Sequence, residues 1–134
     1  MKKKLSKVLL IDDDRPTNFF HEMIIRKKEF SESVFAYRGV SEAMTYLNSI
    51  VENGEAFPDL IFLDLNMPGL DGWDFIEAFK RLDSPLKSFT KIIVLTTTVS
   101  PREKKRALGI PEILDFKNKP LSSELLDEIL QRHF

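Results

Sequence analysis

The chain has 134 residues, a net charge of −1 and no cysteine. This length suits one domain with its own core, and 43% hydrophobic against 31% charged residues is the composition of a folded globular protein. The near-neutral charge argues against a nucleic-acid partner. The lack of cysteine excludes disulfides, thiolate metal sites and cysteine nucleophiles.

The N-terminal region indicates where in the cell the protein is expected. The apolar run Val8–Ile11 stops after four residues at three aspartates, whereas a signal peptide needs about 7–15 apolar residues. No other stretch approaches the length of a membrane span. We therefore expect a cytoplasmic protein without membrane contact, a single domain over residues 1–134 with no output domain.

The first half of the chain alternates predicted strands and helices. Val8–Ile11 is short, branched and apolar, as expected of a strand buried on both faces. Apolar residues at helical spacing predict a helix from Pro16 through about Lys28, and Ser33–Ala36 is a weaker strand candidate. Ser41 is of a type that caps helices and precedes another apolar stripe, so a second helix is expected there.

The middle of the chain continues this alternation. Leu60–Leu63 is the second clear buried strand, and Asp71 and Gly72 mark the start of the next helix. A polar loop, Asp83–Thr90, then leads to a third strongly apolar strand, Ile92–Leu95.

The last part contains one more helix, a strand and a final helix. Ser100 and Glu103 have the spacing of a capping box, with Pro101 in the first helical position. Ile113–Phe116 is a short strand, and Pro120–Ser123 opens the final helix.

Five strands alternating with five helices predict an α/β, doubly wound fold with a parallel sheet. In such folds, ligands bind outside the carboxyl ends of the strands, where the strand order reverses. The polar residues that follow the strands are therefore the candidates for a functional site.

Acidic, hydroxyl and basic residues that could form one site follow four of these strands. Asp12 and Asp13 follow the first, Asp64 the third, Thr96 the fourth and Lys119 the fifth. Carboxylates at close range repel one another, and their charged forms are stable when a cation lies among them. Oxygen ligands without His or Cys favour Mg²⁺, which prefers sites completed by phosphate and water.

The same residues suit phosphate chemistry. A phosphate at Asp64 would find the cation on one side and Lys119 on the other, and Thr96 can donate to one of its oxygens. Phosphoryl transfer requires mainly positioning and neutralisation of charge, and a carboxylate can act as the nucleophile. The set therefore predicts an aspartyl phosphate.

Four segments resemble the response-regulator receiver family, and the resemblance covers nearly the whole chain. They are Val8–Asp14, Asp59–Gly72, Lys91–Thr96 and Phe116–Pro120. The second is the most specific, with Met-Pro three residues after the aspartate at position 64 and Asp-Gly beyond it. The resemblance implies a flavodoxin-like receiver fold with five parallel strands in the order 2-1-3-4-5 and five flanking helices.

The resemblance also implies a metal site and a phosphoacceptor. Asp64 would take the phosphoryl group, and Mg²⁺ would be held by Asp12, Asp13, Asp64 and the backbone carbonyl of Asn66. The donor would be a sensor histidine kinase or a phosphotransfer protein. The protein would catalyse only its own phosphorylation and dephosphorylation.

A switch is implied by the same resemblance. Thr96 would be the switch hydroxyl, Lys119 would pair with the phosphoryl group, and Phe116 would be the switch aromatic residue. Their rearrangement would change the surface formed by the fourth helix, fifth strand and last helix. That surface would control a protein partner or a relay, with the protein a monomer or a phosphorylation-dependent dimer.

Three other functions are considered. A phosphohydrolase working through an aspartyl phosphate often has a second Asp two residues after the nucleophile, where this chain has Asn66. A degenerate receiver acting only as a binding module would have lost site residues that are present here. A flavodoxin-like cofactor binder would not need three acids at this edge of the sheet.

The remaining polar and aromatic residues are expected to have structural roles. Asp14 is predicted to cap the first helix. His21 and His133 are predicted to be surface residues of their helices, and Trp73 is predicted to pack at the start of its helix.

Overall fold

The computed structural model describes residues 4–97 and 100–134. Its sheet has five parallel strands in the order β2-β1-β3-β4-β5, which confirms the predicted fold class and strand order. The strands are β1 (Leu5–Ile11), β2 (Ser31–Tyr37), β3 (Leu60–Asp64), β4 (Lys91–Thr96) and β5 (Ile113–Asn118). The helices are α1 (Arg15–Lys27), α2 (Val40–Asn53), α3 (Gly72–Lys80), α4 (Pro101–Leu108) and α5 (Ser123–His133), with a short 3₁₀ helix η1 (Pro85–Phe89).

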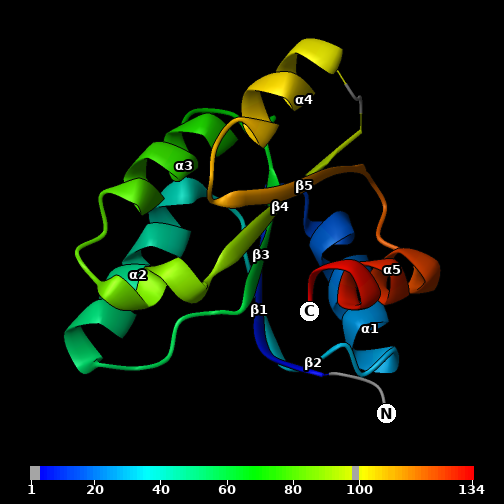
Figure 1. Cartoon of the computed structure of the whole chain (residues 1–134), viewed down its shortest axis with the longest axis horizontal. Coiled ribbons are helices and arrows are strands. Elements are labelled where there is room, and N and C mark those ends of the chain that lie inside the picture. Colours follow the sequence, from blue (N-terminus) through cyan, green and yellow to red (C-terminus); the bar gives the residue numbers. More distant parts are fainter. Residues whose placement is uncertain (1–3, 98–99) are drawn as a thin grey trace.

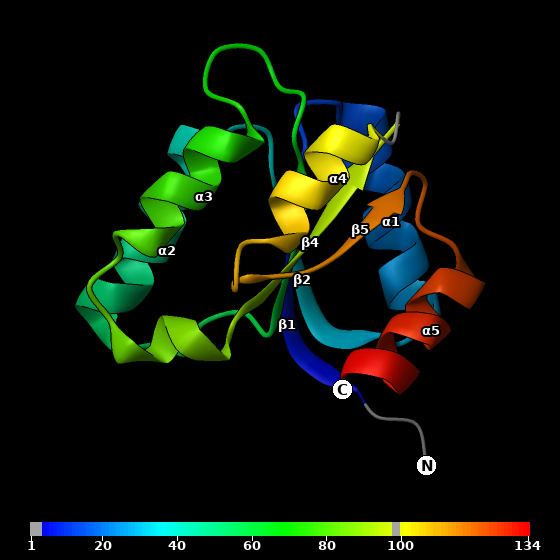
Figure 2. The same cartoon turned by 45° about the horizontal axis from the view of Figure 1, so that its top comes forward.

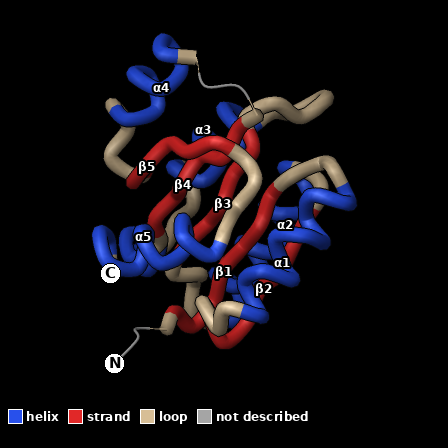
Figure 3. The backbone as a smooth tube through the Cα atoms, turned by 90° about the vertical axis from the view of Figure 1, so that its right-hand side faces the viewer, coloured by secondary structure: helices blue, strands red, loops and turns tan. Residues whose placement is uncertain are grey.

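The sheet separates two layers of helices. Helices α1 and α5 lie on one face, while α2 and α3 lie on the other together with α4, which stands near one end of the sheet (Figures 1 and 2). In Figure 3, which shows the strands side by side, α4 lies beyond β5 and apart from α2. Among the described residues, no helix is long and apolar enough to cross a membrane.

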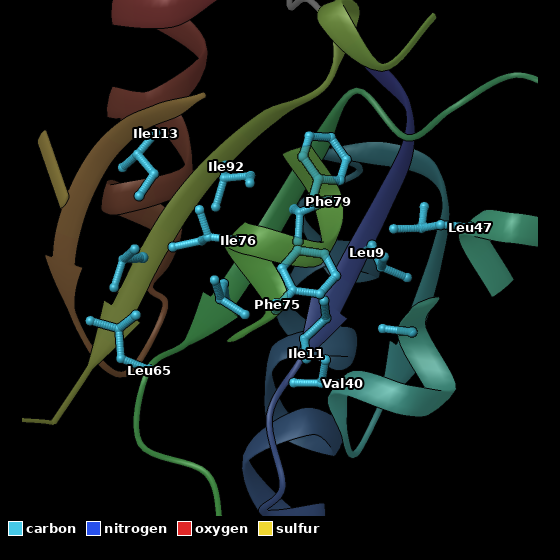
Figure 4. Packing of buried hydrophobic residues seen from close by; sticks show 14 of the residues in the cluster. Leu9, Ile11, Val40, Leu47, Leu65, Phe75, Ile76, Phe79, Ile92 and Ile113 are labelled. Carbon is cyan, nitrogen blue, oxygen red and sulfur yellow. The ribbon is translucent and has the colours of Figure 1, made fainter. Parts of the chain in front are cut away.

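Each face of the sheet has its own hydrophobic core. Because successive side chains of a strand point to opposite faces, Leu9 and Ile11 of β1 pack toward α2 and α3, whereas Val8 and Leu10 pack toward α1 and α5. The side chains of the first core point toward one another in Figure 4, where Phe75 of α3 lies near Ile11. Burial on both faces explains why the central strands are continuous apolar runs.

Two local predictions were wrong. Helix α2 begins at Val40, so Gly39 is its N-cap and Ser41 already lies within the first turn. Gly39 has an extended backbone and gives no side-chain cap, so no capping side chain marks the start of this helix. The loop expected over Asp83–Thr90 contains η1.

The predicted caps are otherwise confirmed in part. The side chain of Asp14 accepts a hydrogen bond from Thr17 N and caps α1. Ser100 caps α4 by accepting from Glu103 N at 3.3 Å, which is one half of the predicted capping box. A complete, reciprocal box is formed instead at the start of α3, between Asp71 and Asp74.

The start of α3 lies tightly against the end of β3. A Cβ atom added to Gly72 would lie 2.7 Å from Asp64 O and 2.7 Å from Leu65 Cα. Both of these atoms belong to the backbone, which cannot rotate away as a side chain can. Gly72 is therefore required by close approach, next to the strand end that carries Asp64.

We expect Gly72→Ala to lower the free energy of unfolding by about 1–3 kcal/mol, because the added methyl group overlaps main-chain atoms. Gly109→Ala is the matched control: it follows α4 in a helical conformation, and its nearest contact to an added Cβ is 3.5 Å. We expect that control to be neutral or up to about 1 kcal/mol stabilising. Urea unfolding of both variants tests this, and equal effects would contradict the proposed close contact.

Candidate functional site

The carboxyl ends of the central strands bring three carboxylates together. Asp12, Asp13 and Asp64 each offer an oxygen, and these three oxygens lie within 4.8 Å of one another. Asp12 and Asp64 are buried, while Asp13 is half-buried. Strand β1 has its sequence neighbour β2 on one side and β3 on the other, so the cluster lies at the point where the strand order reverses.

Lys119 is the cation that faces these acids. Its Nζ lies 2.5 Å from Asp12 Oδ2 and 3.5 Å from Asp64 Oδ2, and its side chain is largely buried. The main chain of Lys119 is held as well, because its N–H donates to Thr96 O at 2.8 Å. One ammonium group is therefore shared between two buried carboxylates.

The electrostatics of the crevice disfavour a charged Asp64. Burial, and then the negative charge of Asp12, raise the pKa of Asp64 above its usual value, while Lys119 and the backbone N–H of Asn66 act in the opposite direction. That N–H donates to Asp64 Oδ1 at 3.2 Å. The ionised form of Asp64 would be favoured by any additional positive charge in the crevice.

The donor set fits a hard divalent cation. It consists of carboxylate oxygens, without the nitrogen or sulfur ligands that softer metals prefer. Asn18 lines a small cavity together with Asp12 and Asp64. Its Oδ1 is buried and accepts no hydrogen bond among the described residues, so it adds an acceptor beside the acids for a metal-bound or ordered water.

The other predicted residues lie around this crevice. Thr96 is buried at the end of β4, and Asn66 is exposed with its N–H turned to Asp64. Phe116 is buried in the core on the side of α2, α3 and α4. Trp73 packs against the same core, as predicted, and the guanidinium carbon of Arg106 lies 3.9 Å from the centre of its ring.

The prediction that His21 is a surface residue was wrong. His21 is only 2% exposed, and its Nε2 accepts a hydrogen bond from Leu121 N at 3.2 Å. Asn18, one turn earlier on α1, is also buried and donates from Nδ2 to Asp12 O at 2.8 Å. The spacing of Asn18, His21 and the buried Ile25 along one helix face is the sequence signal that could have revealed them.

His133 is half-buried, with Nε2 3.4 Å from Asp115 Oδ2.

The fold and its acidic crevice define a flavodoxin-like, doubly wound α/β protein. The chain belongs to the response regulator receiver domain family, whose family model matches residues 8–131. It is 28% identical over 142 residues to the two-component response regulator ARR22 of Arabidopsis thaliana, covering 100% of this chain and 87% of that protein.

Two further similarities extend this result. A crystal structure of a two-component response regulator from Cytophaga hutchinsonii matches with a TM-score of 0.88 and 31% identity, over 97% of both chains. The sensor protein GacS of Pseudomonas syringae pv. syringae is 26% identical over 130 residues, which is 97% of this chain and 14% of that protein. Domains of this type therefore occur in response regulators and within a longer sensor protein.

The buried ring of His21 predicts a pH dependence of stability. Burial lowers the pKa of His21 from 6.5 to about 4. Between these values the unfolded chain binds a proton that the folded protein does not, so the free energy of unfolding falls as the pH is lowered. The slope is at most about 1.4 kcal/mol per pH unit, and residual solvation of the ring reduces it.

His21→Gln keeps an acceptor on a similar side chain but does not titrate. Urea unfolding between pH 7 and pH 4 should therefore show a steeper loss of stability for the native protein than for this variant. The opposing contribution of Asp64 is common to both proteins and cancels in the difference. Parallel stability curves would contradict the lowered pKa.

Proposed function

We propose that this receiver domain accepts a phosphoryl group on Asp64 in a Mg²⁺-dependent reaction. The donor is a sensor histidine kinase or a phosphotransfer protein. The observation that carries the proposal is the position of Asp64 beside two further carboxylates and within 3.5 Å of Lys119 Nζ. The proposal is supported because a carboxylate that can act as a nucleophile, oxygens that could hold a cation and the ammonium of Lys119 lie in one crevice.

The order of the strands favours Asp64 over the other acids as the acceptor. Asp64 ends β3, which lies between β1 and β4. The acids at positions 12 and 13 are thus on one side of it, and the hydroxyl of Thr96 is on the other. Both Asp12 and Asp64 accept a backbone N–H through Oδ1 and face Lys119 through Oδ2. The contacts of Asp12 are shorter, at 3.0 and 2.5 Å against 3.2 and 3.5 Å, so Asp64 is the less tightly held of the two carboxylates.

The proposed transfer step is a simple displacement. An oxygen of the Asp64 carboxylate forms a bond to phosphorus while the bond from phosphorus to the donor breaks, and the donor leaves with that electron pair. Asp12, Asp13 and Asp64 would hold Mg²⁺, which would supply neutralisation of charge on the phosphoryl oxygens. Lys119 holds a second positive charge at the same group, and Thr96 offers a hydroxyl donor.

The residue at position 66 supports a signalling role over a metabolic one. A phosphohydrolase would use a second acid there, and the neutral amide of Asn66 cannot take or give the proton. We therefore assign the protein no activity on outside substrates. Its output is a change of surface recognised by a protein partner or by the next member of a relay.

The proposed output surface is formed by α4, β5 and α5. Thr96 pairs with Asn118 across β4 and β5, and Phe116 pairs with Val94 in the same ladder. A phosphoryl group at Asp64 that draws in the Thr96 hydroxyl therefore acts next to the ladder that supports this surface. Phe116 is already buried, so its response is a repacking of the ring within the core.

Acetyl phosphate with Mg²⁺ should add the mass of one phosphoryl group to the protein, and Asp64→Asn should abolish this addition because the amide is not a nucleophile. Removal of Mg²⁺ by EDTA should also suppress it. Asp14→Asn is the matched control, since Asp14 is an exposed acid that only caps α1. Intact-protein mass spectrometry measures the product. Labelling of Asp64→Asn at the native level would end the proposal.

Thr96→Ala should still accept a phosphoryl group but should not transmit it to the output surface. NMR with beryllofluoride, a phosphoryl mimic, should shift amides across residues 101–134 in the native protein and in Thr96→Ala only around the crevice. Thr97→Ala is the matched control, because Thr97 is exposed beside the buried Thr96. Trp73, the only tryptophan, gives a second readout through its contact with Arg106 of α4. A native-like response in Thr96→Ala would contradict the role of its hydroxyl.

A further inference from the structure

Helix α1 presents two buried polar side chains to the crevice. Asn18 and His21 lie three residues apart and therefore on one face of the helix. Asn18 holds the carbonyl of Asp12, at 2.8 Å. His21 holds the N–H of Leu121, which is 100 residues away in the sequence, at 3.2 Å. One helix is thus tied to two of the three chain segments that carry the charges of the site, the end of β1 and the connection after β5.

The segment held by His21 is the connection that carries Lys119. This connection runs from the end of β5 at Asn118 to the start of α5 at Ser123. Within it, Lys119 N donates to Thr96 O at 2.8 Å and Leu121 N donates to His21 Nε2. The two hydrogen bonds fix the main chain on both sides of Pro120. They therefore restrict the direction in which the Lys119 side chain leaves the backbone.

The hydrogen bond to His21 gives an acceptor to a buried backbone N–H group. Leu121 is buried, and a buried backbone N–H left without an acceptor costs about 1–3 kcal/mol. An acceptor at Nε2 also defines the ring: the proton of the neutral imidazole must lie on Nδ1. A hydrocarbon side chain could fill the same space but could not hold this N–H.

We infer that His21 is a positioning residue for phosphoryl transfer, which fixes the Lys119 ammonium against Asp12 and Asp64 by anchoring the main chain at Leu121. The inference rests on the proposed function. It follows from the contacts above, since Lys119 Nζ reaches Asp12 Oδ2 at 2.5 Å and Asp64 Oδ2 at 3.5 Å from a backbone held in this way. Electrostatic stabilisation of a transferring group depends on such prior placement of charge.

Three substitutions separate the acceptor from the volume of the ring. His21→Leu fills space without an acceptor, His21→Gln carries an amide oxygen near the place of Nε2, and His21→Asn carries the same amide one methylene shorter. Displacement of a catalytic group by about 1 Å can reduce a rate by up to about 100-fold. We expect His21→Leu and His21→Asn to slow phosphorylation by acetyl phosphate with Mg²⁺ by about tenfold, and His21→Gln to remain within about threefold of native.

A double-mutant cycle tests whether the effect passes through Lys119. In a Lys119→Met background, His21→Leu should change the remaining phosphorylation rate by less than about twofold, because the group that it positions is gone. Its effect on urea unfolding should persist in that background. Ile25→Ala is the control for destabilisation alone, since Ile25 is buried on the same face of α1 and holds neither segment. It should lower stability without slowing the folded protein.

The possible outcomes are distinct. Native rates in His21→Leu and His21→Asn would overturn the inference, as would an equal loss of rate with and without Lys119. If His21→Leu does not fold, the comparison of His21→Asn with His21→Gln decides the question, because equal rates in these two amides would overturn it. Absence of any labelling of the native protein at Asp64 would instead reject the proposed function.

Discussion

Asp12 and Asp64 are two buried carboxylates that share the single ammonium of Lys119, and the rest of the site depends on this shared charge. With Asp13 included, full ionisation of the three acids beside one ammonium would leave an excess of two negative charges, in line with the raised pKa of Asp64. Two unit charges about 4 Å apart interact by about 4 kcal/mol at an effective dielectric constant near 20. Repulsion of this size is a substantial fraction of the stability of a small domain, so the crevice is held in shape by the surrounding fold and is prepared for additional positive charge.

The fold supplies that support through backbone contacts from several elements. Gly72 lets the start of α3 approach the end of β3, where Asp64 lies. Thr96 O receives the N–H of Lys119, which ties β4 to the chain after β5. Helix α1 contributes Asn18 and His21 from below the crevice. These neutral contacts hold the main chain from which the charged side chains extend, so the backbone of the site is supported against the repulsion among the acids.

How much of this structure the sequence predicted depends on how far apart in the chain the interacting residues are. Buried strands such as Leu60–Asp64 were predictable because burial on both faces produces a continuous apolar run. The starts of β1 and β2 were placed too late, since Leu5 and Ser31 belong to strands by pairing with each other across the sheet. The helix beginning at Val40 was misplaced because its N-cap, Gly39, has no side chain that could mark a helix start in the sequence.

The candidate site was also predictable in part. The acids and Lys119 directly follow strands, and parallel strands gather their carboxyl ends at one edge. His21 was missed because a polar residue on a helix is usually exposed, and its acceptor role depends on Leu121, a residue that no local pattern connects to it. Buried polar residues with distant main-chain partners are therefore the part of a site that sequence patterns reveal least.

Helix α4 is the element from which the proposed switch would require the largest response, and it has few buried contacts. Only Ala107 of this helix is buried, and the helix stands at the periphery of the molecule (Figures 1 and 3). One of its contacts with α3 is the cation–π pair of Arg106 and Trp73, and such a contact contributes about 0.5–1 kcal/mol at an exposed site. Elements with few buried contacts have the lowest cost of local rearrangement. Under the proposed function, a phosphoryl group with about −1.5 to −2 charge would need to shift only this balance, and the tightly packed central strands could stay in place.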